Sequence, residues 1–235
     1  MNGSAAHAAY ARLRDLIVNL DLPPGSALRE ADVQLQVGVG RTPLRDAFQR
    51  LAQEGMLRIY PRRAIVVAKL GLPEMRQIFE VRLALEPAAA ALAAQRLTAS
   101  EADALSSLEA DLRVAADRSE VSTFLEADQI FHRAIAQYAQ NPLLADYVDH
   151  VQTLNLWLWN MYFHTHRARS SELFGHQAIV DALLAGDSRA AAAAMHDHVV
   201  QSRTQLLTGL DRAEPARARA RARQSDISRR YAGSR

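Results

Sequence analysis

One predicted helix carries an aspartate and a histidine on the face that also holds its large apolar side chains. In the stretch EADQIFHRAIAQ, Asp128 and His132 are four residues apart, so they lie one turn apart on one helix face. Phe124, Phe131 and Ile135 share this face and are typical core residues. Because burying an ionisable group costs free energy unless it is paired or bound, the pattern predicts that both polar side chains meet a partner inside the fold.

Two later predicted helices also carry histidines. His176 lies on an apolar stripe that continues through Ile179 and Leu183. On the last helix, His196 and His198 point to different faces, and the neighbouring apolar residues do not decide which one faces inward. Neutral imidazoles and a carboxylate are common ligands of divalent transition ions. On pattern alone, a metal site and hydrogen-bonded core histidines are equal alternatives.

The composition excludes several classes of site and protein. With 235 residues, 49% of them hydrophobic, the chain can form one large domain or two modest ones. It has no cysteine, which excludes disulfides and thiolate metal ligands. No apolar run is long enough to span a membrane, and the N-terminus lacks the basic and apolar regions of a secretory signal. We therefore expect a cytoplasmic protein without membrane contact.

Charge is segregated along the chain although the total is only +2. Residues 1–70 hold 10 basic and 6 acidic side chains, residues 71–211 hold 10 and 18, and residues 212–235 hold 8 and 2. A basic start, an acidic middle and a basic end favour a polyanion-binding function confined to part of the chain. Chance alone can produce an excess of four charges, so the pattern adds support without deciding the function.

The elements that must position these residues change character near residue 70. Residues 1–70 are predicted to form three helices and a β-hairpin, at about residues 8–20, 29–36, 41–54, 57–60 and 65–68. Residues 71–211 are predicted to form an all-helical antiparallel bundle of six helices, starting at about residues 73, 99, 121, 142, 171 and 188. Residues 212–235 form a basic tail with almost no large apolar residues, which predicts disorder. The fold class is therefore mostly α.

Three helices with a tight turn before the third, followed by a hairpin, is the order of a winged helix-turn-helix, in which the third helix enters the major groove of DNA. The segment GVGRTPLRDAFQRL would form that third helix, with basic and polar residues facing outward. The predicted DNA contacts are Arg41, Thr42, Arg45 and Gln49 on the helix, and Arg62 and Arg63 at the hairpin tip. The alternative is that these are solvated arginines on a small packing domain.

The first domain resembles the DNA-binding domain of GntR-type bacterial transcription regulators. The resemblance is carried by LPPGSALRE, by GVGRTPLRDAFQRLAQEGML and by the wing. It implies that Arg41, Thr42 and Arg45 contact an operator and that the wing adds contacts. Gly40 stands where a serine normally caps the recognition helix, and glycine is an acceptable cap. Ala64 stands where the wing usually has glycine, which changes the freedom of the wing backbone.

The remaining chain, residues 73–210, resembles the all-helical FCD effector domain of the FadR subfamily, with six helices as in its VanR-like branch. The matching pieces are EVRLALEPAAAALAA, ADQIFHRAIAQYAQNPLL, HQAIVDALLAGD and AAAAMHDHV. The resemblance implies a metal bound by Asp128, His132, His176 and His198, and it selects His198 over His196 because the ligand follows Met195 by three. Zinc is the expected ion, with nickel and manganese as alternatives.

The same resemblance implies that a small organic acid completes the coordination of the ion. Arg82 matches an arginine that faces the cavity and could pair with the acid's carboxylate. The equally weighted alternative is a surface salt bridge between Arg82 and Glu86, one turn further along. Asn155 is the second candidate effector contact, from a helix whose other candidate cavity residues are Trp157, Trp159 and Asn160. For the two tryptophans, packing or dimer contacts are the better expectation.

Together these features predict a homodimeric bacterial transcription regulator, a repressor of a palindromic operator that an acid effector releases. Two rival hypotheses remain. A metal with open coordination positions could activate water in an enzyme, but no second carboxylate or histidine is clearly placed as a general base, so we expect no enzymatic activity. The other rival is a purely structural metal without an effector.

Overall fold

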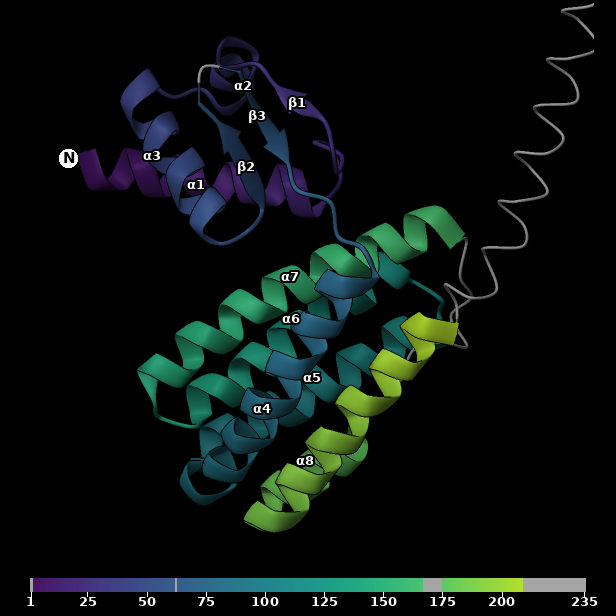
Figure 1. Ribbon diagram of the computed structural model, residues 1–235. Helices are drawn as coiled ribbons and strands as arrows, with labels where there is room; N and C mark the ends of the chain where they lie inside the picture. The colour runs from purple at the N-terminus through teal and green to yellow at the C-terminus, as the bar shows by residue number, and fades with distance from the viewer. Residues whose placement is uncertain (1, 62, 167–174, 209–235) are drawn as a thin grey trace, which may run out of the picture.

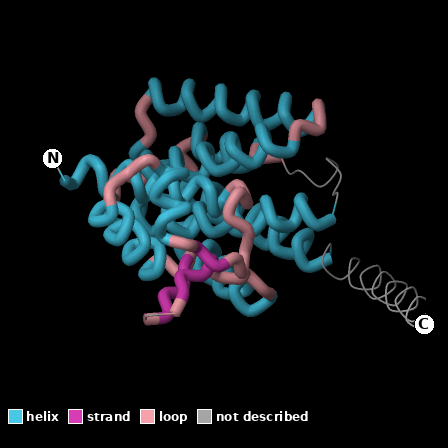
Figure 2. The backbone as a smooth tube through the Cα atoms, turned by 90° about the horizontal axis from the view of Figure 1, so that it is seen from above, coloured by secondary structure: helices cyan, strands magenta, loops and turns pink. Residues whose placement is uncertain are grey.

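In the computed structural model, the described residues are 2–61, 63–166 and 175–208, and they form a small N-terminal domain above a larger helical bundle (Figure 1). Seen from above, the strands occupy one small region of an otherwise helical molecule (Figure 2). This confirms the mostly α fold. No helix in the described part of the chain is both long and apolar enough to cross a membrane. The tail predicted to be disordered, residues 212–235, lies outside the described residues.

The N-terminal domain has the predicted order of three helices followed by a hairpin. Its elements are α1 (Asn2–Val18), β1 (Ala27–Leu28), α2 (Glu30–Val37), α3 (Arg41–Gln53), β2 (Leu57–Tyr60) and β3 (Ala64–Val67). The strands form an antiparallel sheet in the order β1-β3-β2. Most bounds differ from the prediction by one or two residues, and two differences are larger. Helix α1 begins about six residues earlier, and β1, at two residues, is too short to give a periodic signal.

Glycine makes the tight turn between α2 and α3 and the turn after α3. Gly38 caps the C-terminus of α2 with φ of 74°, and Gly55 follows α3 with φ of 78°. This left-handed backbone region strains residues that carry a Cβ. Gly40 precedes α3 as its N-cap, in an extended conformation and without a side-chain hydrogen bond, as the substitution of the usual serine implied. The turns place α3 against α1, where Leu44, Phe48 and Leu51 are buried in the core.

The bundle contains six helices within the described residues, as predicted. They are α4 (Leu72–Arg96), α5 (Ala99–Asp117), α6 (Val121–Tyr138), α7 (Pro142–His166), α8 (Gln177–Leu184) and a further helix at residues 188–208. Of the helix predicted from about residue 171, residues 171–174 lie outside the described residues, and α8 begins only at Gln177, so His176 precedes the helix on which it was predicted. Helix α5 starts at a capping box in which the backbone N–H of Glu101 bonds the side chain of Thr98, and the Glu101 carboxylate accepts from the backbone N–H of Thr98.

The bundle core is an extended apolar cluster contributed by all six of these helices. Helix α7 lies on the side of the bundle that faces the N-terminal domain and contacts α1 (Figure 1). Trp157 of α7 is completely buried, and it packs into the core of the N-terminal domain rather than into that of the bundle. The two domains are therefore joined by a packed contact in addition to the chain that connects them.

Candidate functional site

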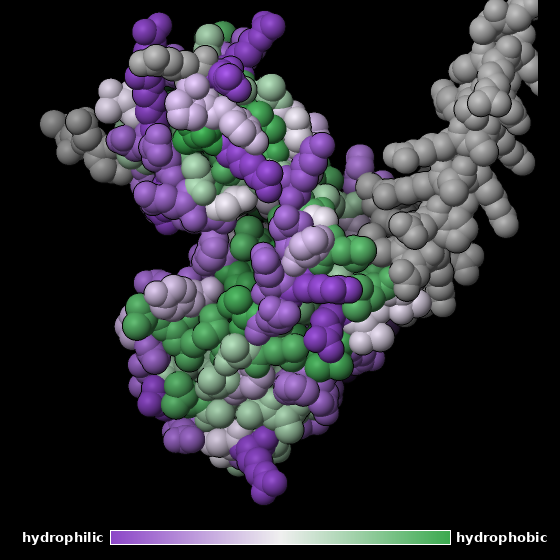
Figure 3. All heavy atoms as spheres, in the orientation of Figure 1, coloured by the Kyte–Doolittle hydropathy of each residue, from purple (hydrophilic) through white to green (hydrophobic). Residues whose placement is uncertain are grey.

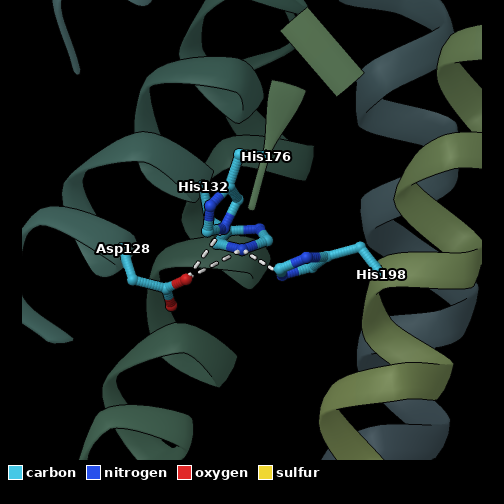
Figure 4. A group of neighbouring side chains, drawn as sticks. All are labelled: Asp128, His132, His176 and His198. Atoms are coloured by element: carbon cyan, nitrogen blue, oxygen red, sulfur yellow. Dashed lines mark hydrogen bonds and ion pairs between the residues drawn. The ribbon is translucent and has the colours of Figure 1, made fainter. Parts of the chain in front are cut away.

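The four predicted metal ligands converge in the interior of the bundle. Asp128 and His132 come from α6, His176 immediately precedes α8, and His198 comes from the 188–208 helix (Figure 4). One ligand atom from each of the four lies within 4.8 Å of the others, and all four residues are buried. The i, i+4 spacing on α6 therefore brings its carboxylate and imidazole to the same site as two imidazoles from distant parts of the chain.

Two of the distances between the donor atoms match those around a single small ion, and a third is slightly longer. Nε2 of His132 lies 3.3 Å from Nε2 of His198. Oδ1 of Asp128 lies 2.9 Å from Nε2 of His176 and 3.7 Å from Nε2 of His132. With metal–ligand bonds of about 2.0–2.1 Å, neighbouring ligand atoms are roughly 3.0–3.4 Å apart in tetrahedral or octahedral geometry. Three imidazoles and one carboxylate are also a donor set that suits zinc, nickel or manganese.

The charges around the site prepare two of the imidazoles to bind a metal. Burial and the nearby His176 and His132 hold the pKa of His198 well below its usual range, and burial lowers the pKa of His176. Burial would also lower the pKa of His132, but the carboxylates of Glu86 and Asp128 outweigh it and raise the pKa to about 9. A metal ion at this site would meet two neutral imidazoles, and its binding would have to displace a proton from the third.

Glu86 of α4 is a site residue that the sequence pattern did not identify. Its Oε2 lies 2.6 Å from Nδ1 of His132, on the side of the ring opposite the metal-facing nitrogen. Burial opposes ionisation, but the Arg82 guanidinium and His132 lower the pKa of Glu86 to about 2. A carboxylate that accepts from the second ring nitrogen fixes the orientation of a metal-binding histidine. Glu86 was considered only as a partner of Arg82, because nothing in the spacing linked it to a residue 46 positions away.

Arg82 and Asn155, the candidate effector contacts, bond to each other beside the candidate metal site. Nη1 of Arg82 donates to Oδ1 of Asn155 at 2.9 Å, and Nη2 donates to Oε2 of Glu86 at 3.3 Å. Both residues are at most 2% exposed. The expected ion pair between Arg82 and Glu86 thus exists, but it is buried and does not lie on the surface. An effector role for Arg82 and Asn155 stays a prediction.

Two other residues of α7 that were considered for the cavity lie at the domain contact instead. Nδ2 of Asn160 donates to the backbone carbonyl of Val18, at the end of α1, over 2.9 Å. Trp157 packs against the N-terminal domain, in agreement with a packing role. Trp159 packs inside the bundle, stacked on Phe163 at 5.5 Å between ring centroids. Their periodicity on α7 could not show which domain they would contact.

The candidate DNA contacts on α3 share an exposed face of the N-terminal domain. Arg41, Thr42, Arg45 and Gln49 are all exposed. Arg63 is exposed beside β3, whereas Arg62 lies outside the described residues. A hollow of about 530 Å³ lies between α3 and the hairpin, and Arg45, Gln49 and Arg63 contribute to its lining. Basic side chains from the helix and from the wing therefore border the same side of the domain, where a winged helix-turn-helix would meet DNA.

Arg45 is held in an ion pair that spacing alone did not predict. Its Nε donates to Oε1 of Glu30 at 2.9 Å and its Nη2 donates to Oε2 at 3.2 Å. Glu30 is the first residue of α2, so the pair bridges the two helices of the helix-turn-helix. One edge of the guanidinium is thereby occupied, and Nη1 remains on its outer edge. The Glu30 carboxylate therefore lies among the basic side chains that are predicted to contact DNA.

Sequence comparison connects both domains to known proteins. Residues 5–67 match the bacterial regulatory proteins of the gntR family, and residues 77–201 match the FCD domain. The HTH-type transcriptional repressor RspR of Escherichia coli is 31% identical over 190 residues, which cover 81% of this chain and 83% of RspR. A probable D-xylose utilization operon transcriptional repressor of Paenarthrobacter nicotinovorans is 30% identical over 188 residues, covering 76% of this chain and 78% of that protein.

Solved structures share the fold over most of the chain. E. coli McbR/YncC superposes with a TM-score of 0.76 at 22% identity, covering 87% of this chain and 97% of that one. A GntR regulator from Rhodococcus sp. RHA1 gives 0.69 at 20% identity, with coverage of 87% and 98%. Identity at this level shows the fold alone, whereas the sequence matches show the family. The chain is a bacterial transcription regulator of the gntR family, with an N-terminal helix-turn-helix domain and a C-terminal FCD domain.

Proposed function

We propose that this regulator is a repressor whose affinity for a palindromic operator is set by a divalent metal and a small organic acid bound in the bundle. The observation that carries the proposal is the meeting of Asp128, His132, His176 and His198 at spacings suited to one ion. Two of the imidazoles are held neutral and the third is oriented by Glu86. Zinc is the first candidate, with nickel and manganese as alternatives.

The acid would bind where the protein leaves the ion's coordination incomplete. An ion with four protein ligands can expand its coordination, and when bound it supplies a positive charge that attracts a carboxylate. Arg82 is the cationic side chain that we expect to bind the acid, because its guanidinium already bonds Asn155 and Glu86 beside the site. Its guanidinium has five N–H donors, and these two bonds together with the Nε bond to Glu86 use three of them. Donors therefore remain for an effector carboxylate.

A homodimer is the expected form of the repressor on DNA. Large apolar residues are exposed on the bundle, among them Leu143 at 65% and Tyr147 at 58% on α7. Figure 3 shows apolar residues gathered over the bundle, whereas hydrophilic residues dominate the N-terminal domain in the same view. A second copy would cover such a surface, and two-fold symmetry would present two copies of α3 to the two halves of a palindrome.

The proposal is tested by melting metal-loaded and metal-stripped protein in parallel against a panel of small organic acids. A ligand that binds only the folded state raises the melting temperature. We expect at least one acid to stabilise the loaded protein and to leave the stripped protein unchanged. The Arg82→Lys variant reports whether the acid uses the guanidinium. If stripping lowers the melting temperature and no acid shifts either form, the metal is structural and the sensing role is wrong.

Removing the carboxylate from the basic surface should strengthen DNA binding. Glu30→Gln leaves a side chain of the same shape but frees Arg45 and removes a charge that repels phosphate. We expect DNA to bind roughly two- to fivefold more tightly at low salt, since exposed ion pairs are weak, and the gain should shrink as salt rises. Fluorescence anisotropy over a salt series measures this, with Asp21→Asn as a control of equal charge change. Weaker operator binding by Glu30→Gln would mean that Glu30 positions Arg45 for DNA.

A further inference from the structure

Helix α7 contacts the N-terminal domain through one face. Trp157 is completely buried in the core of that domain, and the partly buried Leu154 and Met161 pack beside it. Asn160 donates to the carbonyl of Val18, the last residue of α1. Helix α1 in turn makes the most extensive helix contact of the N-terminal domain with α3, the recognition helix. A displacement of α7 therefore reaches α3 through a single intervening helix.

Another residue of the same helix takes part in a buried polar chain that leads to the metal site. Asn155 accepts from Nη1 of Arg82, Arg82 bonds Glu86, and Glu86 lies 2.6 Å from Nδ1 of His132. All four residues are at most 2% exposed. We call His132, Glu86, Arg82 and Asn155 the relay. It connects α6, α4 and α7 in the described structure.

We propose that the relay makes α7 the element that transmits the state of the metal site to the DNA-binding domain, with Trp157 as the joint. This inference rests on the proposed function and adds the route of its regulation. His132 would hold the ion through its metal-facing ring nitrogen, and the position of the ring would then determine, through Nδ1, where the Glu86 carboxylate lies. Arg82 donates hydrogen bonds both to that carboxylate and to Asn155. A shift of the His132 ring therefore changes the hydrogen bonds that Asn155 makes on α7.

The hydrogen bonds and the packing of the relay favour passing a displacement from residue to residue over absorbing it locally. A buried polar group that loses its partner costs free energy comparable to a full desolvation, so relay members move together or exchange partners. Tightly packed interiors also pass displacements on, because they have few voids to absorb them. The joint is held by packing: the indole Nε1–H of Trp157 has no hydrogen-bond partner among the described residues, and the side chain is completely buried in the core of the N-terminal domain.

The sequence supplies a reporter for the joint. The chain has two tryptophans, Trp157 and Trp159, so Trp159→Phe leaves the joint residue as the single tryptophan. In this background we expect zinc added to metal-stripped protein to change the emission of Trp157. Asn155→Ala breaks the relay at its far end without touching a metal ligand. Asp146→Ala, on the exposed side of α7, is the matched control.

The decisive experiment compares, in the parent and in Asn155→Ala, the affinity for zinc with the effect of zinc on Trp157 emission and on operator affinity. We expect Asn155→Ala to bind zinc within about twofold of the parent by calorimetry, and to lose most of the zinc-dependent emission change. Zinc should change operator affinity at least about fivefold in the parent, within the usual range of allosteric coupling, and less than twofold in Asn155→Ala. If Asn155→Ala folds poorly, Trp157→Phe, followed by operator binding alone, tests the same coupling at the joint.

The outcomes separate the relay from the function on which it rests. If the parent's operator affinity responds to zinc and Asn155→Ala responds equally, the relay is wrong while the metal-sensing function stands. If the parent's operator affinity does not respond to zinc, zinc alone does not regulate DNA binding, and the Trp157 emission then decides whether the relay moves α7. An emission change that Asn155→Ala retains in full overturns the inference in either case.

Discussion

Zinc is expected to raise the melting temperature of the metal-stripped protein by about 10 °C, and His198→Ala is expected to lose most of that gain. At a free zinc concentration of about 1,000 times Kd, mass action adds about 4 kcal/mol, and for a chain of this size each kcal/mol raises the melting temperature by roughly 2–4 °C. Removing one of four ligands from this buried site should weaken zinc binding at least about a hundredfold, more than the loss of an outer partner does.

The last helix offers a matched control for this prediction. His196 lies two residues before His198 but is exposed, with 53% of its side chain accessible. His196→Ala should therefore bind zinc like the parent. Differential scanning calorimetry and a zinc titration measure both variants. Equal zinc affinity of the parent, His196→Ala and His198→Ala would show that the four side chains do not form the metal site.

The same site should show opposite pH trends with and without metal. The pKa of His132 is raised from 6.5 to about 9 in the folded, metal-free protein, so the stability it contributes is complete below pH 6.5 and is lost as the pH rises towards 9. Zinc binding must displace that proton, so zinc affinity should increase over the same pH range.

Replacing a recognition-helix arginine should have the largest effect on DNA binding. Arg41→Ala is expected to weaken operator binding roughly 5- to 150-fold, because a bidentate arginine contact to guanine contributes about 1–3 kcal/mol. Gln49→Ala removes no charge, so it should reduce discrimination between sequences without changing the salt dependence. Arg63→Ala, on the wing, should lower the slope of log affinity against log salt by about one phosphate contact.

A charge-matched variant on the bundle controls for general electrostatics. Arg189 is exposed at the start of the 188–208 helix, far along the chain from α3. Arg189→Ala should leave operator affinity nearly unchanged. The measurement is fluorescence anisotropy with an operator selected from random DNA, at several salt concentrations. Equal losses in Arg41→Ala and Arg189→Ala would mean that α3 does not read the operator.

The sequence predicted those features that depend on local pattern. Local sequence signals located α5 and β2 at their observed bounds, and the apolar periodicity identified the inward face of α6 that carries Asp128 and His132. A helix face has a fixed geometry, so residues four apart must share it. The ligand set could be assembled only with the help of a family resemblance, because nothing local distinguishes His198 from His196.

The features that were missed all depend on contacts between distant segments. Glu30 meets Arg45 across a helix-turn-helix, and Glu86 meets His132 across 46 residues of chain. Trp157 sits on an apolar stripe that fits either domain, and only the packed structure shows that it enters the N-terminal one. The ion pair between Arg82 and Glu86 was foreseen from its spacing, but its burial was not, since burial depends on what α7 places over it.

The most direct test of the central claim compares operator affinity in three forms of the same protein: metal-stripped, zinc-loaded, and zinc-loaded with the acid found by the melting screen. The four ligands and the relay predict that the acid weakens operator binding at least about fivefold when zinc is present, and that it has no effect on the stripped protein. Equal operator affinity in all three forms would contradict a metal- and acid-responsive repressor.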